Sequence, residues 1–307
     1  MRRSLGLLLA ALALGPAGAL AGGTEKEEVL FTRLRGRIEA IDASIDGVLG
    51  VFVKDLKTGR SLEVRPDETF PTASTIKVAV LYELYRQSAE GKVDLGEVTR
   101  PPLPRVRGGG VLQELGDRVS LTWRDLACLM LAFSDNEATN LLIRRLGMDS
   151  VNHRLDALAF TKTRLRRRMM DLEAARRGDE NVSTPAELAR LMVTLRDGQA
   201  LDPALAKDLR EVAALPRWDT LTSKPSFLSV IPEGVRVLEK SGELEGVRAC
   251  VAVVELKTRP YVAAIMTTHL RRDADGDAVI REISSALWET FDRLDRASDL
   301  GRIISER

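Results

Sequence analysis

The sequence of 307 residues is short of the residues on which several functions depend. It has two cysteines, two histidines and 4% aromatic residues. So few aromatic residues argue against a surface that stacks nucleic-acid bases. His153 and His269 have no second histidine, cysteine or acidic cluster at ligand spacing, so we expect neither a metal nor another cofactor. The formal net charge is +1, from 46 basic and 45 acidic residues, which predicts no general attraction to nucleic acid or to a membrane surface.

Long hydrophobic runs are also scarce. The run over residues 5–14 follows Arg2 and Arg3 and is too short to cross a bilayer as a helix. Ala19-Leu20-Ala21 is a small-x-small cleavage site. We predict a signal peptide over residues 1–21 and a periplasmic or secreted protein without a stable membrane anchor.

Cysteine usage leaves one choice open. Export would permit a disulfide, but Cys128 falls in a predicted helix and Cys250 in a predicted strand. Two buried free thiols are the interpretation we favour.

Hydrophobic periodicity predicts strands at both ends of the chain and helices between them. This order indicates an α+β fold of the α/β/α sandwich type, in which helices pack on one antiparallel sheet and a helical lobe is inserted. We expect one domain over residues 22–307, with a sheet lobe (about 24–70 and 215–300) and a helical lobe (about 71–214). The predicted strands cover residues 47–56, 61–65, 235–238, 247–256 and 261–268, and the predicted helices 26–42, 75–89, 121–133, 136–146, 149–158, 185–197, 203–214 and 277–296.

The most informative motif is the S-x-x-K box from Ser74 to Lys77. Residues three apart lie on one face of a helix, so the hydroxyl and the amine can meet. A hydroxyl becomes a useful nucleophile when a neighbouring base takes its proton, and a desolvated lysine can be that base.

Two further motifs follow in order, Ser134-Asp135-Asn136 and Lys240-Ser241-Gly242. S-x-x-K, S-D-N and K-[T/S]-G in this order are typical of penicillin-recognising serine enzymes. From about residue 30 to residue 295, the chain therefore resembles the class A serine β-lactamases. Three flanking segments support the resemblance: Phe70-Pro71-Thr72-Ala73, Ala138-Thr139-Asn140 and Ser183-Thr184-Pro185.

The resemblance implies a five-stranded antiparallel sheet and an active site in the cleft between the two lobes. It also implies catalytic roles for three residues. Ser74 would be the nucleophile that a β-lactam acylates, and Lys77 would accept or relay its proton. Ser134 would pass a proton to the departing lactam nitrogen.

The same resemblance assigns the substrate-binding residues. Asn136 would bind the substrate amide, and Lys240 and Ser241, with Gly242 completing their motif, would bind the substrate carboxylate. The backbone N–H of Glu243 would form an oxyanion hole with that of Ser74. Arg248 on the next strand would add positive charge, although a solubilising arginine at a strand edge is an equal alternative.

The base that releases the acyl group is the point at which the chain departs from the family. Class A enzymes carry a glutamate in an omega-shaped loop, in a pattern resembling E-x-x-L-N. In the corresponding segment here, residues 168–173, the glutamate position falls on Met169 and the asparagine position on Glu173. Either Glu173 holds the hydrolytic water, with Asp171 as a weaker candidate, or the acyl-enzyme is long-lived. We favour Glu173 as the general base.

These residues predict a serine hydrolase that acts on cyclic amides, a β-lactamase associated with antibiotic resistance. The alternatives are a D-alanyl-D-alanine carboxypeptidase-like enzyme of the cell wall and a penicillin-binding protein that hydrolyses slowly or not at all. The expected partner is a small β-lactam or a cell-wall peptide, and nothing in the sequence demands more than a monomer.

Two charged segments receive ordinary interpretations. The basic run over residues 162–168 is expected to be a solvated loop with local ion pairs, not a site for an anionic polymer. Residues 273–277 alternate aspartates as a calcium-binding loop does, but they lack the remaining ligand positions and the terminal glutamate of such a loop. We therefore expect a turn that caps a helix.

Overall fold

The computed structural model describes residues 24–216, 226–298 and 300–303, and the predicted signal peptide lies outside these residues. Within the described residues, no helix is both long enough and apolar enough to cross a membrane. The described helices are α1 (Glu25–Ser44), α2 (Lys77–Ala89), α3 (Trp123–Ala132), α4 (Asn136–Leu146), α5 (Met148–Ala157), α6 (Leu172–Arg176), α7 (Pro185–Asp197), α8 (Pro203–Ala213), α10 (Asp273–Arg296) and the 3-10 helices η1 (Ala73–Ile76), η2 (Leu112–Glu114) and η3 (Phe227–Val230). The strands are β1 (Val48–Asp55), β2 (Ser61–Val64), β3 (Phe70–Pro71), β4 (Val98–Thr99), β5 (Leu121–Thr122), β6 (Val182–Ser183), β7 (Val237–Leu244), β8 (Val247–Val254) and β9 (Tyr261–Thr268).

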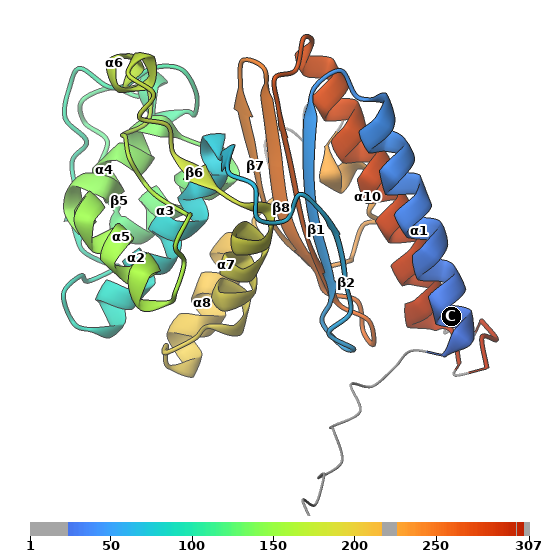
Figure 1. Ribbon diagram of the computed structural model, residues 1–307. Helices are drawn as coiled ribbons and strands as arrows, with labels where there is room; N and C mark the ends of the chain where they lie inside the picture. Colours follow the sequence, from blue (N-terminus) through green and yellow to red (C-terminus); the bar gives the residue numbers. More distant parts are fainter. Residues whose placement is uncertain (1–23, 217–225, 299, 304–307) are drawn as a thin grey trace, which may run out of the picture.

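A five-stranded sheet divides the molecule into layers. Its order is β2-β1-β9-β8-β7, and every neighbouring pair is antiparallel. Helices α1 and α10 lie side by side on one face, while α7 and the helical lobe lie on the other (Figure 1). The predicted α/β/α arrangement is confirmed. Helix α7, which the chain order assigned to the helical lobe, packs against β1, β8 and β9.

Both faces of the sheet are buried, which explains why most residues of its central strands are apolar. All eight residues of β8 are buried. The side chains of a strand alternate between the two faces, so they enter two separate cores. One core joins the sheet to the helical lobe and includes Val251 and Val253. The other lies under α1 and α10 and includes Cys250 and Ala252.

Helix α2 forms the centre of the helical lobe. Ten of its thirteen residues are buried, including Val78, Leu81 and Tyr85, and it contacts α4, α5, α7 and α8. A helix that is buried on nearly all sides is enclosed by other elements. Its N-terminal end is thereby fixed against the edge of the sheet, where β7 contacts η1.

Several predicted boundaries change in the structure. Strand β7 continues to Leu244 instead of ending at residue 238, so Lys240-Ser241-Gly242 lies within a strand. The closing helix begins at Asp273, so residues 273–277 form its first turn and not a separate turn that precedes it. Cys128 and Cys250 form no disulfide, as predicted, but only Cys250 is buried, whereas Cys128 is half-buried.

The basic run over residues 162–168 forms local ion pairs, as expected. Arg164 pairs with Asp156 at 2.5 Å, and Arg167 pairs with Glu180 at 2.8 Å. These contacts fold the segment onto the body of the helical lobe.

Candidate active site

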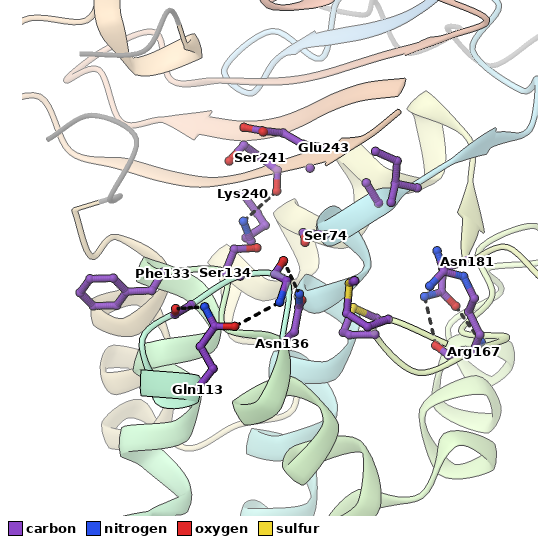
Figure 2. A pocket seen from close by; sticks show the side chains of 18 of the residues that line it. Ser74, Gln113, Phe133, Ser134, Asn136, Arg167, Asn181, Lys240, Ser241 and Glu243 are labelled. Atoms are coloured by element: carbon purple, nitrogen blue, oxygen red, sulfur yellow. Dashed lines mark hydrogen bonds between the residues drawn. The ribbon is translucent and has the colours of Figure 1, made fainter. Parts of the chain in front are cut away.

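A cavity of about 540 Å³ lies between the end of the sheet at β7 and the helical lobe. All three sequence motifs contribute to it, as Figure 2 shows for Ser74, Ser134 and Lys240. Its lining consists of Ala73, Ser74, Gly108, Gly109, Gly110, Gln113, Ala132, Phe133, Ser134, Asn136, Arg167, Met169, Met170, Glu180, Asn181, Lys240, Ser241, Gly242, Glu243 and Leu244.

Ser74 lies in η1, in the turn that precedes α2. The preceding residue, Ala73, has a left-handed backbone with φ of 47°. Ser134 and Met170 also have positive φ, of 51° and 60°, and also line the cavity. Non-glycine residues in this region cost on the order of 1–3 kcal/mol each, and such strain tends to gather at functional sites.

Lys77 is fully buried at the floor of the site. Its Nζ donates to Ser134 O at 2.7 Å, to Ser134 Oγ at 3.1 Å and to Asn136 Oδ1 at 3.1 Å. Burial lowers the pKa of Lys77 well below its usual value, the Lys240 cation lowers it further, and the Asp135 carboxylate acts in the opposite direction. The amine is therefore suited to accept a proton from a neighbouring hydroxyl.

Helix α4 and the glycine-rich loop fix the S-D-N turn. Asp135 caps α4 by accepting from Ala138 N at 2.9 Å, and it also accepts from Leu112 N at 2.7 Å. Asn136 Nδ2 donates to Gly108 O at 3.0 Å. A Cβ on Gly110 would lie 2.2 Å from Asp135 Oδ2, so the loop can approach this closely only because it carries glycine. The turn that carries Ser134 is thus held on two sides.

Gly242 brings β7 into contact with the segment that carries the nucleophile. A Cβ at this position would lie 2.7 Å from Thr72 O and 2.9 Å from Ser74 N. The backbone of β7 therefore passes directly beside the N–H of Ser74. This close approach is compatible with an oxyanion hole formed by the backbone N–H groups of Ser74 and Glu243, which stays a prediction.

Lys240 and Ser241 lie in the cavity, but Arg248 does not. Arg248 Nε contacts Asp277 Oδ1 at 2.9 Å and Nη2 contacts Asp273 Oδ2 at 3.2 Å, and Nη1 donates to Leu244 O and Val247 O at 3.0 and 2.9 Å. The expectation that Arg248 binds the substrate carboxylate is corrected. Its place in β8 turns the side chain toward the first turn of α10, which holds the guanidinium.

Residues 166–181 form the loop that we call the omega-like segment. Hydrogen bonds hold it at its neck, where its two ends meet. Asn181 Oδ1 accepts from Arg166 N at 2.7 Å and from Arg167 N at 3.0 Å, while its backbone O accepts from Thr72 N at 2.9 Å. Arg167 donates through Nη2 to Glu180 Oε2 at 2.8 Å. Figure 2 shows Arg167 and Asn181 together at one side of the cavity. These bonds join the segment to the turn that carries Ser74.

Met169 occupies the position at which the family resemblance implies a glutamate. Its side chain lines the cavity and is 7% exposed. Asn140 Oδ1 accepts from Met169 N at 2.8 Å, and Asn140 Nδ2 donates to Met169 O at 3.0 Å. The position is therefore ordered and directed into the site, but it carries a thioether in place of a base.

The structure does not bring Glu173 to the cavity. Glu173 lies in the first turn of α6 and is exposed. Asp171, the weaker candidate, is also exposed and caps α6 by accepting from Ala174 N at 2.9 Å. The assignment of Glu173 as the base is therefore corrected. The short helix α6, which periodicity did not predict, turns these carboxylates toward solvent.

Several residues of the site were not found from the sequence. Gln113 and Glu180 lie in ordinary-looking segments, and Asn140 was noted only as part of the flanking segment Ala138-Thr139-Asn140. No local pattern assigns these residues a role, because their roles depend on contacts between distant segments. The triple glycine at 108–110 was recognised only as a loop, although its close approach to Asp135 gives it a place in the site.

An S-x-x-K serine, a buried lysine of lowered pKa and two further motifs around one cavity define a serine hydrolase of the penicillin-recognising class. The chain belongs to the β-lactamase enzyme family, whose model matches residues 33–291. It is a class A-like serine hydrolase that acts on β-lactams. One similar protein is the β-lactamase ROB-1 of Haemophilus influenzae, which is 32% identical over 259 residues, covering 79% of each chain.

Solved structures agree with this membership. An ancestral class A β-lactamase superposes with a TM-score of 0.76 at 29% identity, covering 84% of this chain and all (100%) of that one. An acyl-enzyme complex of a PBP-A variant with penicillin G superposes with a TM-score of 0.75 at 26% identity, covering 85% of this chain and 97% of that one. The five-stranded fold is thus shared by structures described as β-lactamases and by one described as PBP-A.

Proposed function

We propose that the protein is a serine β-lactamase-like hydrolase in which β-lactams acylate Ser74 readily and hydrolysis of the acyl-enzyme is the slow step. One observation carries the proposal. Met169 lies at the ordered position from which the family's glutamate would act on water, and its thioether cannot accept a proton.

The groups proposed for acylation lie at or beside one cavity, and Lys77 contacts Ser134 there. Lys77 Nζ takes the proton of Ser74, and the alkoxide attacks the lactam carbonyl to form a tetrahedral oxyanion. The N–H groups of Ser74 and Glu243 bind that oxyanion. The C–N bond then breaks, and Ser134, in contact with Lys77 at 3.1 Å, passes a proton to the lactam nitrogen.

Deacylation lacks the general base that the family uses, because Met169 stands in its place. Water must attack the ester while a base takes its proton. Among the residues that line the described cavity, the carboxylates are Glu180 and Glu243. Glu180 is held by Arg167 at 2.8 Å, so its carboxylate is already engaged by a guanidinium. Glu243 belongs to β7, on the opposite side of the cavity from the omega-like segment.

The test is to mix the purified protein with a chromogenic cephalosporin and to follow hydrolysis and intact mass together. The expected result is one adduct per chain that forms in a burst and then decays slowly, with no adduct in Ser74→Ala. Rapid turnover without an accumulating adduct would contradict a slow second step. If the wild-type protein forms no adduct, Ser74 does not react with lactams and the proposal fails.

A second candidate is a cell-wall enzyme that cleaves a peptide ending in D-alanyl-D-alanine. The same Met169 supports it, because such an enzyme need not discharge penicillin quickly. Release of D-alanine from a synthetic peptide with this ending would favour it. A penicillin adduct that forms without such release would favour the lactam hydrolase.

We also propose that the protein is exported, loses residues 1–21 and works as a soluble monomer in the periplasm or outside the cell. The support is the basic start, the short apolar run and the Ala19-Leu20-Ala21 site. N-terminal sequencing of the exported protein is expected to begin at residue 22, and light scattering is expected to give the mass of one chain. An uncleaved, membrane-bound product would contradict export as a soluble protein.

A further inference from the structure

We infer that Glu243 gives the cavity a negatively charged subsite beside the carboxylate subsite, so that substrates with a cationic group on the leaving-group side are favoured. This inference rests on the proposed function. It assigns the Glu243 side chain a part in specificity, separate from the contribution of its backbone N–H to the oxyanion hole.

The position of Glu243 follows from the strand that carries it. Glu243 lines the cavity in β7 and is exposed. Side chains two apart in a strand share a face, so Glu243 lies on the same side of β7 as Ser241. Figure 2 shows both side chains at the strand, with Lys240 on the side toward Ser74. The carboxylate of Glu243 is thus next to the pair that we expect to bind the substrate carboxylate.

Arg248, the residue opposite Glu243 on the neighbouring strand, forms its ion pairs with other residues. Glu243 is directly opposite Arg248 in the pairing of β7 with β8, and such residues can form cross-strand ion pairs. Instead, the guanidinium of Arg248 binds Asp273 and Asp277 at 3.2 and 2.9 Å. Among the described residues, no hydrogen bond or ion pair reaches the Glu243 carboxylate, which belongs to the lining of the cavity.

The other charged residues in the described part of the cavity lining are Arg167, Glu180 and Lys240, and each has contacts of its own. Arg167 and Glu180 neutralise each other at the neck of the omega-like segment. Lys240 is 1% exposed and donates through Nζ to Ser241 O at 2.7 Å. Lys240 therefore serves the deep side of the subsite, while Glu243 faces its outer side.

The consequence concerns the group attached near the substrate carboxylate. An ammonium or pyridinium there is attracted by Glu243, whereas a second anionic group is repelled. The Glu243 side chain is exposed, so salt and water screen the interaction and its effect is modest. A selectivity of roughly two- to fivefold is expected for a single charge of this kind.

Two cephalosporins with the same thienylacetamido side chain make the test. Cephaloridine carries a pyridinium beside its carboxylate, and cephalothin carries a neutral acetoxy group. Single-turnover acylation of Ser74 is measured with each, and the ratio of the two rates is compared between wild type and Glu243→Gln, so that the intrinsic reactivities of the two probes cancel. Glu245→Gln is the matched control, since Glu245 lies two residues further on, is exposed and does not line the cavity.

We expect the cephaloridine-to-cephalothin ratio to fall roughly two- to fivefold in Glu243→Gln at low salt, to fall less at high salt and to stay at the wild-type value in Glu245→Gln. An unchanged ratio in Glu243→Gln, with acylation still observed, would overturn the proposed subsite and leave the proposed function standing. Equal falls in both variants would also overturn it, because the effect would then come from general surface charge. If neither probe acylates the wild-type protein, the proposed function fails, and the subsite with it.

Discussion

The side-chain amide of Asn140 holds the backbone of Met169 in both directions, accepting from its N–H at 2.8 Å and donating to its carbonyl at 3.0 Å. Asn140 is 2% exposed, so both bonds are shielded from water. The arrangement fixes a position that points into the cavity. Position 169 is therefore well ordered, but its side chain cannot accept a proton.

Replacing Met169 by glutamate is expected to speed deacylation. A positioned general base contributes about 10²- to 10⁴-fold, and the Asn140 bridge already orders the backbone for one. The measurement is the decay of the Ser74 acyl-enzyme, followed by intact mass after excess β-lactam is removed.

Two controls accompany this substitution. Met169→Gln introduces a side chain of nearly the same shape as glutamate but without a base. Its acyl-enzyme is expected to decay as slowly as that of the wild type. Glu173→Gln is expected to do the same, because Glu173 is exposed on α6. If Glu173→Gln instead trapped the adduct, the original assignment of Glu173 would be restored.

Asn140→Ala is expected to destabilise the protein and loosen the omega-like segment. It removes two buried hydrogen bonds and leaves their backbone partners unsatisfied, at a cost of about 1–3 kcal/mol for each group. Urea denaturation measures the loss of unfolding free energy, and the acylation rate reports on the site.

Asn152→Ala is the matched comparison, because Asn152 bridges Leu165 N and O in the same way, at 3.0 and 2.9 Å. It is expected to lower stability while leaving acylation much less affected. Equal losses of acylation in the two variants would argue that the Met169 contact has no special connection to the site.

Acylation is expected to increase with pH. Burial lowers the pKa of Lys77, so the neutral amine that accepts the Ser74 proton becomes populated well below pH 10.5. The rate should rise as pH passes through this lowered pKa and then level off. Stopped-flow acylation measured across a pH series tests this.

The rise should disappear in Lys77→Arg, because a guanidinium keeps its proton throughout this range. Circular dichroism checks that the variant is folded. A wild-type rate that falls with increasing pH over the same range would exclude the neutral amine as the acceptor.

Gly242→Ala is expected to impair acylation severely. The added Cβ would lie 2.7 Å from Thr72 O and 2.9 Å from Ser74 N, so β7 or η1 must move and the two oxyanion donors separate. Loss of one such donor costs about 10²- to 10³-fold in rate. The measurement is the single-turnover acylation rate.

Gly36→Ala is the control, because no atom lies within 4 Å of the added Cβ and alanine favours the helical conformation of α1. It is expected to keep full activity and to raise the melting temperature slightly. Normal acylation in Gly242→Ala would show that the close approach of β7 is not needed for oxyanion binding.

The sequence could predict the parts of the fold that depend on local pattern. The apolar run over residues 249–254 of β8 and the cap at Thr122 depend on neighbouring residues alone. Thr122 caps α3 with Asp125 in a reciprocal capping box. Ser74, Ser134 and Lys240, which line one cavity, could also be identified from the sequence, because each belongs to a short and locally recognisable motif.

Other features required the three-dimensional structure. Arg248 reads equally well as a substrate ligand or as a surface residue until the first turn of α10 is seen to bind it. Glu173 is close in sequence to the expected base, but α6 turns it away from the cavity.

By itself, then, the sequence determined how Ser74 can be acylated, since that chemistry is carried by short motifs of fixed spacing. It also determined that the usual base is replaced by Met169. Only the tertiary structure decided which charges face the substrate. The reason is physical: an ion pair or a backbone bridge depends on distances between segments that are far apart in the chain, as with Asn140 and Met169.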